Sequence, residues 1–570
     1  MVESSRNSSI QNESTEFTNH QMKLNFLRMK LEKFQHRLLE DVRERTTDFV
    51  DEIVGEMDFY EFNNREFKNW NLQYQNYATT PHKLMPSSSS DKSKNQAIRP
   101  DAPTKKTDNT AAQESSAKRL PQRLKQNFAD KLFVSRESYL TALFKVNHIK
   151  TILHIFYVIL LVLFLNTLCY SYFAEEKIKI GLEAFKSGFE KIEYVFVVWC
   201  FQHVFVFTVY FAFKIWALVR SKIYKSDLML RYWSLSCLAI YISSQLYFGY
   251  LASIWCLKLD LPFVSAVVLL LESTRLLMKM HSYVRLIAAK VITGKLKVDD
   301  SAEDTSDNGL FLIPKFGRYL YFLFAPTLIY RDSYPRTSHI RWKFALTRLM
   351  EVVAVAFICS YLHERYIRAH FLNMCLEEVH VSTVIVKIFG MFMPSIIIFL
   401  CGFYTVLHSW LNFTAEILRF GDRLFYKDWW TSSSFDAYYR NWNIVVHDWL
   451  YEFIYKDFYQ HVLKGSKAAA AFMVFLISAV VHEHILSLAL QSFFPVLFFF
   501  FFVFSVPMFY ITRNLPKTFG NVLLWGLLVV GNGIVISLYS MEYYASQNFL
   551  RSYESWFDYF IPTVWVCYNK

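Results

Sequence analysis

The sequence predicts an all-α polytopic membrane protein, with about nine transmembrane helices, additional interfacial helices and a cytosolic N-terminal helix. The chain has 570 residues, of which 53% are hydrophobic and 19% are charged, whereas a soluble domain carries about a quarter charged residues. Its apolar residues also gather into blocks close to the roughly 20 residues that a helix needs to cross a bilayer. Both observations argue against a soluble globular protein.

The long apolar blocks begin near residue 150. Inside a hydrocarbon core every backbone polar group must bond within its own segment, so each block is expected to be a helix. Two long aromatic and charged connections, 286–343 and 411–467, are expected to hold interfacial helices. The expected spans are 151–173, 194–219, 233–256, 262–281, 345–364, 381–407, 468–490, 493–512 and 521–541.

Positive charge gathers on alternate connections between these spans. Lysines and arginines precede the first span and follow the second, fourth, sixth and eighth, whereas residues 174–193 balance lysine with glutamate. Because basic flanks stay in the cytosol, this pattern predicts a cytosolic N-terminus and a C-terminus on the far side of the membrane. The net charge of +12 is explained in the same way, without a nucleic-acid partner.

Residues 1–121 are expected to form a cytosolic N-terminal region, and residues 122–570 the membrane-embedded domain. Residues 78–121 are polar and contain proline and serine, as a disordered tether does. An oligomerisation helix is predicted at about 21–55, with a surface helix packed on its own chain as the alternative. The residues with heptad spacing are Leu24, Leu27, Leu31, Phe34 and Leu38.

The eight cysteines contain no CxxC pair and mostly lie in or beside apolar stretches. This spacing favours small buried hydrophobic residues over a disulfide framework or a metal site. His482 and His484 do not suggest a zinc site either, because residues two apart point about 200° away from each other on a helix. We therefore expect no metal and no cofactor.

The expected seventh span contains His482, Glu483 and His484 within an otherwise apolar helix. Ionisable groups at membrane depth are costly and usually face a protein or water-filled cavity; hydrogen bonds between helices are the structural alternative. Lys467, Ser478 and His482 fall within about 60° of one another around the helix, and His482 lies roughly 22 Å beyond Lys467 along the axis. Such a track suits a polyanionic head joined by a long thin arm to a reactive centre, which is the shape of a coenzyme A thioester.

A second polar constellation occupies residues 421–458. This segment is dense in tryptophan and tyrosine, as segments at the level of lipid headgroups are, but it also contains Asp, Asn, Arg and His. Within it, residues in steps of four share one helix face. They are Asn443, His447, Tyr451 and Tyr455.

One stretch of this constellation resembles the FYxDWWN signature of the membrane-bound O-acyltransferases that use fatty acyl-CoA. In this chain it reads Phe425, Tyr426, Lys427, Asp428, Trp429 and Trp430. Trp442-Asn443 and the ValValHisGlu sequence at 480–483 resemble the paired Asn and His of that family's active site. Three further stretches, 272–285, 325–337 and 443–451, resemble the sterol O-acyltransferase branch.

The resemblance implies an enzyme that transfers a long-chain fatty acyl group from acyl-CoA to the 3-hydroxyl of a sterol, which yields a steryl (cholesteryl) ester. It also implies the endoplasmic reticulum membrane and a homo-oligomer, either a dimer or a tetramer. One alternative is an enzyme of the same family that acylates diacylglycerol or a long-chain alcohol. Another is a non-catalytic membrane scaffold or transporter.

For this chemistry we expect His482 to act as the general base, with burial favouring its neutral form. We expect the Asn443 amide to hold the thioester oxygen or to orient the substrate. The basic residues of the acyl-CoA path would meet the CoA phosphates. By resemblance, that path is lined by Arg440, Trp442, Tyr455, Lys467 and Ser478.

One residue departs from the signature, because Thr431 stands where the family has Asn. A threonine hydroxyl can cap the turn that follows it, which would make the exchange structurally cheap. If the family's Asn instead contacts acyl-CoA through its amide, this chain should bind the donor more weakly or be inactive.

Overall fold

The computed structural model describes residues 131–174, 182–223, 225–293, 313–376, 380–463 and 465–551, together with 555, 558 and 560–568. All of these belong to one unit of the fold, Asp108–Lys570. The expected oligomerisation helix and the tether lie outside the described residues. Where the chain is described, its regular structure is helical apart from two isolated β-bridges, Arg136–Asp422 and Arg336–Phe420.

Seven helical segments of the described chain are long and apolar enough to cross a membrane. They coincide with seven of the expected spans, so the polytopic all-helical fold is confirmed. The helices that form their main parts are α5 (Asn147–Ala174), α7 (Ile192–Lys222), α8 (Asp227–Lys258), α11 (Trp342–Leu362), α14 (Phe392–Phe403), α18 (Lys467–Ala489) and α21 (Lys517–Asn548).

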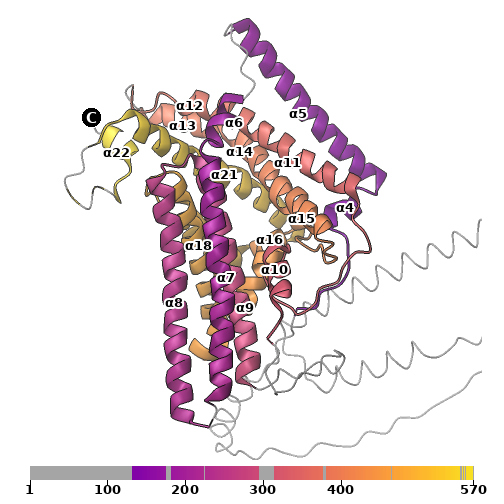
Figure 1. The fold of residues 1–570 in the computed structure, drawn as a ribbon. Coiled ribbons are helices and arrows are strands. Elements are labelled where there is room, and N and C mark those ends of the chain that lie inside the picture. The colour runs from indigo at the N-terminus through magenta and orange to yellow at the C-terminus, as the bar shows by residue number, and fades with distance from the viewer. Residues whose placement is uncertain are drawn as a thin grey trace, which may run out of the picture. The chain divides into compact units, whose positions relative to one another are not determined.

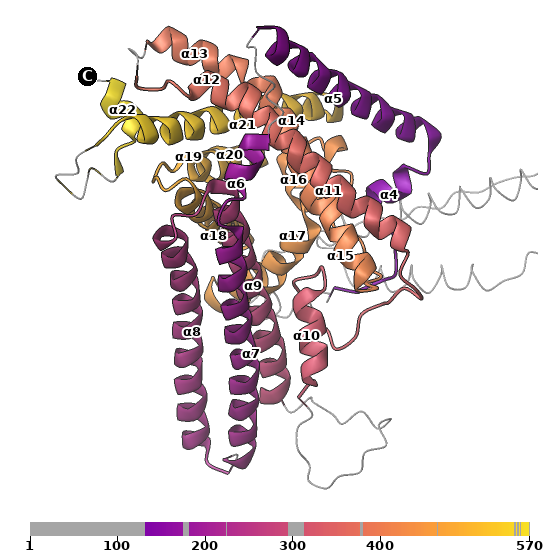
Figure 2. The ribbon, with the colours of Figure 1, turned by 45° about the horizontal axis from the view of Figure 1, so that its top comes forward.

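The other two expected spans are helical, but they fall outside those criteria. Val496–Thr512, which begins with α19 (Val496–Phe498) and ends with α20 (Ser505–Thr512), is shorter than 18 residues. The second is α9 (Phe263–Ile292), a 30-residue helix that carries charged side chains among its apolar ones. In Figures 1 and 2, α9 runs beside α7 and α8, and it also contacts α18.

The charge of Lys279 on α9 is satisfied by the end of a neighbouring helix. Its Nζ donates to the carbonyl oxygens of Phe322, Leu323 and Ala325 at 2.6, 2.9 and 2.7 Å, at the C-terminus of α10 (Phe316–Phe324). The last carbonyls of a helix lack partners within the helix and carry partial negative charge. They therefore stabilise a lysine that is only 1% exposed.

The expected span 381–407 is interrupted. One helix, α13 (Val381–Gly390), ends just before α14 begins. We attribute the break to Pro394, which has no N–H and whose ring would clash with the carbonyl of Gly390 in a continuous helix. From Phe392 the helix continues through a π-helical turn into α15 (Leu411–Ile417), and Figure 2 shows this span beside α11.

A disulfide joins Cys375, which follows α12 (Ala369–Phe371), to Cys567 in α22 (Thr563–Tyr568). The interpretation of the cysteines as small buried hydrophobic residues, without a disulfide, was therefore wrong for this pair. These two residues are 192 positions apart, and no local spacing pattern marks such a pair. The other six cysteines are free thiols.

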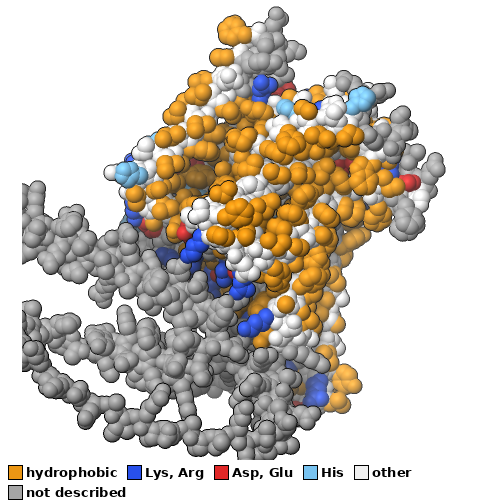
Figure 3. All heavy atoms as spheres, turned by 180° about the vertical axis from the view of Figure 1, so that it is seen from behind, with side chains coloured by type: hydrophobic (Ala, Val, Ile, Leu, Met, Phe, Trp, Pro, Cys, Tyr) orange, Lys and Arg blue, Asp and Glu red, His pale blue; other side chains and the backbone are white. Residues whose placement is uncertain are grey.

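Much of the molecular surface is apolar. Hydrophobic side chains cover most of the face in Figure 3, and the Lys and Arg side chains gather toward its lower part. On the spans, Ile152, Ile240 and Leu246 are 62%, 68% and 72% exposed. Apolar surface of this extent requires a lipid surrounding.

Candidate active site

Glu483 ties α18 to its neighbours. Its carboxylate accepts hydrogen bonds from the Tyr539 hydroxyl at 2.9 and 3.0 Å and from the Phe498 backbone N–H at 2.8 Å. Only 6% of the residue is exposed. Glu483 therefore connects α18 with α19 and α21, so the structural alternative holds for this member of the polar trio.

The two histidines beside Glu483 point in different directions. His484 Nε2 lies 3.2 Å from Ser253 Oγ on α8, whereas His482 stacks on Phe501 with ring centroids 5.2 Å apart. His482 is exposed, so its expected burial among protein side chains was wrong. The physical reason is helical geometry: Glu483 takes the interior direction, and its neighbour lies about 100° away.

The hydrogen bond of His482 fixes which of its nitrogens can accept a proton. Nδ1 lies 2.7 Å from the carbonyl oxygen of Ser478, one turn earlier, and 3.5 Å from the Ser478 hydroxyl. A carbonyl oxygen can only accept, so Nδ1 carries the hydrogen of the neutral ring and Nε2 presents a lone pair. In this orientation Nε2 can accept a proton from a ligand.

Asn443 stands at the junction of two helices. It ends α16 (Phe435–Trp442) and begins α17 (Ile444–Leu450), where its Oδ1 accepts from the Val446 backbone N–H at 3.1 Å. An asparagine oxygen is preferred at such an N-cap. The cap uses the oxygen alone, which leaves the amide nitrogen as a donor for a ligand.

A row of parallel rings continues from Asn443 along the same face. His447, Tyr451, Tyr455 and Tyr459 stack with centroid distances of 6.5, 5.4 and 6.1 Å. The expected alignment in steps of four is therefore confirmed and extends one step further. Tyr455 lies in the middle of this row, where its ring is half-buried.

The segment before α4 (Tyr139–Leu143) holds α17 from the side. Lys131 forms an ion pair with Asp448, whose carboxylate also lies 3.5 Å from His447 Nδ1. Burial opposes ionisation of Asp448, but hydrogen bonds from His447 and Lys131 outweigh it and lower the pKa of the carboxyl below its usual range. This contact ties the N-terminal side of the membrane domain to the site.

Phe501 contacts both of the sequence segments that carry the candidate residues. Its ring contacts His482 on one side and Tyr439 of α16 on the other, at a centroid distance of 5.6 Å. Tyr439 also contacts Phe475 of α18 at 5.2 Å. The helix that carries His482 and the segment that carries Asn443 therefore share an aromatic wall.

A largely apolar cavity of about 430 Å³ between α18 and α20 is open to the surface, where its lining residues Phe472 and Tyr510 are 46% and 54% exposed. It begins one residue after Lys467 and reaches Phe475, in the aromatic wall. A pocket of this size and character suits a hydrocarbon chain. Its lining residues are Ala468, Ala469, Ala471, Phe472, Phe475, Val506, Phe509 and Tyr510.

The remaining residues expected on the acyl-CoA path fall into two groups. Lys467 is the exposed first residue of α18, and Arg440 pairs with Asp436 at 3.0 Å while 44% of its side chain stays exposed. Both cations can be reached by a polyanion. Trp442 instead stacks on Phe399 at 4.7 Å and packs against the core, so we assign it a packing role.

The signature segment holds the backbone around Asn443. Phe425, Tyr426 and Trp429 are at most 1% exposed. The backbone N–H of Lys427 donates to Asn441 O, and that of Ile444 donates to Phe425 O, both at 2.9 Å. Asp428 directly precedes the short 3-10 helix Trp429–Thr431, and Trp430 is the middle residue of that helix. The signature segment therefore supports the backbone around Asn443.

Thr431 does not cap the following helix. Its hydroxyl donates backward to the Asp428 carbonyl at 2.8 Å and lies 3.1 Å from the Asp428 carboxylate. Ser434 caps α16 by accepting from the Ala437 N–H at 3.2 Å. The expected forward cap was wrong because the serine nearer the helix start takes that place.

Sequence reasoning missed a buried polar group behind the signature. His408, in the π-helical turn after α14, has Nε2 2.6 Å from Arg348 Nη1 and Nδ1 2.6 Å from Tyr426 Oη. His408 and Tyr426 are both 0% exposed. The available signal was polar residues at helical spacing inside apolar spans, Arg348 with Glu351 and His408 with Asn412.

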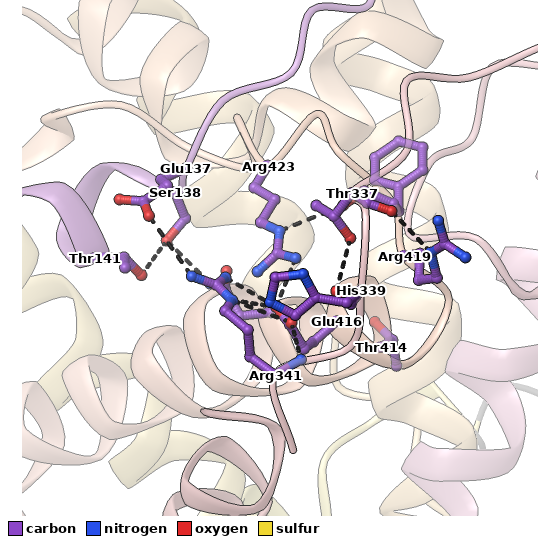
Figure 4. A network of polar contacts seen from close by, with 12 residues as sticks. Glu137, Ser138, Thr141, Thr337, His339, Arg341, Thr414, Glu416, Arg419 and Arg423 are labelled. Carbon is purple, nitrogen blue, oxygen red and sulfur yellow. Dashed lines mark hydrogen bonds and ion pairs between the residues drawn. The ribbon is translucent and has the colours of Figure 1, made fainter. Parts of the chain in front are cut away.

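A second anchor lies just before the signature, as Figure 4 shows. Glu416 is 0% exposed and forms ion pairs with Arg341 Nη2 at 2.9 Å and with Arg423 Nη2 at 2.7 Å. Arg423 is itself 2% exposed and stands two residues before Phe425. The Glu416 carboxylate therefore holds the backbone that directly precedes the signature segment.

Comparison with known proteins agrees with this arrangement. Residues 271–541 match the family model described as MBOAT, membrane-bound O-acyltransferase family. The chain belongs to the membrane-bound O-acyltransferases.

Its relatives narrow the branch within that family. Sterol O-acyltransferase 1 of Mus musculus is 37% identical over 441 residues, which cover 77% of this chain and 79% of the relative. Sterol O-acyltransferase 2 of Homo sapiens is 33% identical over 445 residues, or 77% and 81%. The chain is thus similar to sterol O-acyltransferases over most of its length, and the expected family is confirmed.

Proposed function

We propose that this chain is an acyl-CoA-dependent sterol O-acyltransferase that transfers a long-chain fatty acyl group to the sterol 3-hydroxyl. The observation that carries the proposal is the orientation of His482, whose Nδ1 is bound by a carbonyl and whose Nε2 is open. The family supports the reaction class, and the relatives support the acceptor. The product is a steryl ester, with cholesterol as the model acceptor.

In this reaction His482 Nε2 takes the proton of the sterol hydroxyl as that oxygen attacks the thioester carbonyl. The Asn443 amide donates to the developing oxyanion. The new ester C–O bond forms, the C–S bond breaks, and the imidazolium returns its proton to the CoA thiolate. The scheme needs no metal and no further cofactor.

The donor would follow α18 inward from its first residue. Lys467 and Arg440 meet the phosphates of CoA, and the cavity beside α18 takes the fatty acyl chain. Tyr455 and Ser478 line the narrow arm of the donor. Lipid surrounds the site, and a sterol can enter it from the bilayer.

We assign the protein to the endoplasmic reticulum membrane, with a cytosolic N-terminus and a luminal C-terminus. The disulfide supports this orientation, since Cys375 and Cys567 follow the expected fifth and ninth spans, which end on the same side. Disulfides form in oxidising compartments. A homo-oligomer, dimer or tetramer, remains the expected assembly.

The test uses the purified protein in sterol-free micelles. Labelled oleoyl-CoA is supplied with cholesterol, diacylglycerol and a long-chain alcohol together, and label should enter mainly the steryl ester. His482→Ala should lose ester formation at unchanged oligomer size. His484→Ala is the matched control, because that histidine contacts only Ser253 among the hydrogen bonds described for it.

Two outcomes would contradict different parts of the proposal. Label in triacylglycerol or wax ester would keep the acyl transfer and reject the sterol as acceptor. Near-normal turnover by His482→Ala would reject the assignment of the base.

A further inference from the structure

The buried polar group behind the signature contains an ion pair that the acyl transfer does not use. Arg348 Nη2 and Glu351 Oε1 on α11 lie 2.6 Å apart, with side chains 13% and 17% exposed. Ser409 donates to the same carboxylate at 2.7 Å. Burying such a pair costs desolvation energy that apolar side chains of similar volume would not cost.

The pair orients His408. An arginine guanidinium can only donate, so His408 Nε2 accepts from Arg348 and its Nδ1 carries the hydrogen. That hydrogen is donated to Tyr426 Oη at 2.6 Å. The contact leaves one arrangement for both rings, which are fully enclosed.

The two residues on either side of Tyr426 form backbone hydrogen bonds with residues close to Asn443. Its preceding residue, Phe425, accepts from Ile444, and its following residue, Lys427, donates to Asn441, both at 2.9 Å. These two bonds hold the chain on either side of Asn443. A shift of the Tyr426 ring is therefore transmitted to the asparagine by backbone bonds.

We propose that Arg348 and His408 are positioning residues for acyl transfer, which fix Tyr426 and through it the backbone around Asn443. Neither residue touches the reacting atoms in this assignment. The inference rests on the proposed role of Asn443. A displacement of about 1 Å in a catalytic group can slow a reaction about a hundredfold. The effect of losing these positioning contacts on kcat should therefore be large enough to measure.

The first experiment compares Tyr426→Phe and Arg348→Gln in the purified full-length protein. Each should lower kcat about tenfold to a hundredfold while KM for oleoyl-CoA changes less than about twofold. The matched control is Glu272→Gln, which breaks an Arg–Glu pair of the same 2.6 Å length and i, i+3 spacing on α9 and should keep kcat. Arg348→Lys should recover part of the loss.

A second comparison tests the route. In an Asn443→Ala background, Arg348→Gln should lower kcat by less than about twofold, because the group that it positions is absent. If Arg348→Gln lowered kcat in that background as much as it does in the wild type, the positioning route would be contradicted, but the proposed role of Asn443 would not. Near-normal kcat in Asn443→Ala by itself would contradict the proposed role of Asn443.

Stability must be separated from positioning. A fall in Tm with unchanged kcat of the folded enzyme would reject the inference and leave a structural role. Should Arg348→Gln not fold, Tyr426→Phe decides, since it removes a single hydroxyl: wild-type kcat in that variant would also reject the inference.

Discussion

The two segments that meet at the site hold their functional side chains in opposite ways. His482 is oriented by a carbonyl of its own helix, one turn earlier, and by a single stacked ring. Asn443 lies in a chain segment that is anchored from outside by Glu416, His408 and Lys131. One side chain is positioned locally and the other by contacts that are remote in sequence.

This difference follows from backbone chemistry. A helix satisfies its own N–H and C=O groups, so a side chain on it is placed without further partners. The irregular chain around the signature needs explicit partners, and the structure supplies them as buried polar contacts. Distant substitutions should therefore disturb Asn443 and leave His482 unaffected.

The largest expected effect is at the anchor before the signature. Glu416→Gln leaves the buried guanidinium of Arg423 and the partly exposed guanidinium of Arg341 without their carboxylate, and should cost about 3–5 kcal/mol of stability. Thermal unfolding in detergent measures this. Asp332→Asn, which breaks an ion pair whose side chains are 42% and 44% exposed, should cost less than about 1 kcal/mol. Equal losses would show that burial of the anchor is unimportant.

Asn443→Asp separates the two functions of the asparagine. The carboxylate still accepts from the Val446 N–H, so the N-cap and Tm should be kept. The donor to the oxyanion is lost, and kcat should fall about 10²–10³-fold. Single-turnover rates and Tm are the measurements. An effect on KM alone would indicate a binding role instead.

Removing the disulfide changes a part of the molecule other than the two segments that carry His482 and Asn443. Cys567→Ser should remove about 2–4 kcal/mol of stability, because the bond closes a long loop. Its effect on kcat at low temperature should be small, since the contacts described for His482 and for the Asn443 side chain involve Ser478, Phe501 and Val446, none of which lies in α22. A marked loss of kcat in the fully folded variant would show that the site depends on the C-terminal helix.

The sequence was sufficient to predict features that depend on residues close together in the chain. Long apolar blocks predicted the spans, and helical spacing predicted that His447, Tyr451 and Tyr455 share one face, where their rings are in fact stacked. It was insufficient where contacts join distant positions. The Cys375–Cys567 bond and the route from Arg348 through His408 to Tyr426 depend on tertiary neighbours that no periodicity reveals.

The exposure of His482 shows a subtler limit. An apolar helix with one polar trio predicts that some of its groups face inward, but not which one. Glu483 occupies the interior because Tyr539 and Phe498 supply donors there. The two histidines are turned outward as a consequence of that choice.

The smallest expected effect is at the residue that departs from the signature. Thr431→Asn restores the family's side chain, whose amide can donate to Asp428 as the threonine hydroxyl does. Because Thr431 is exposed and makes its contacts within one turn, kcat, KM for oleoyl-CoA and Tm should all stay close to wild type, with stability changing by less than about 0.5 kcal/mol. Steady-state kinetics across oleoyl-CoA concentrations test this. A tenfold lower KM would mean that the amide contacts the donor directly, and that the signature segment binds acyl-CoA as well as bracing Asn443.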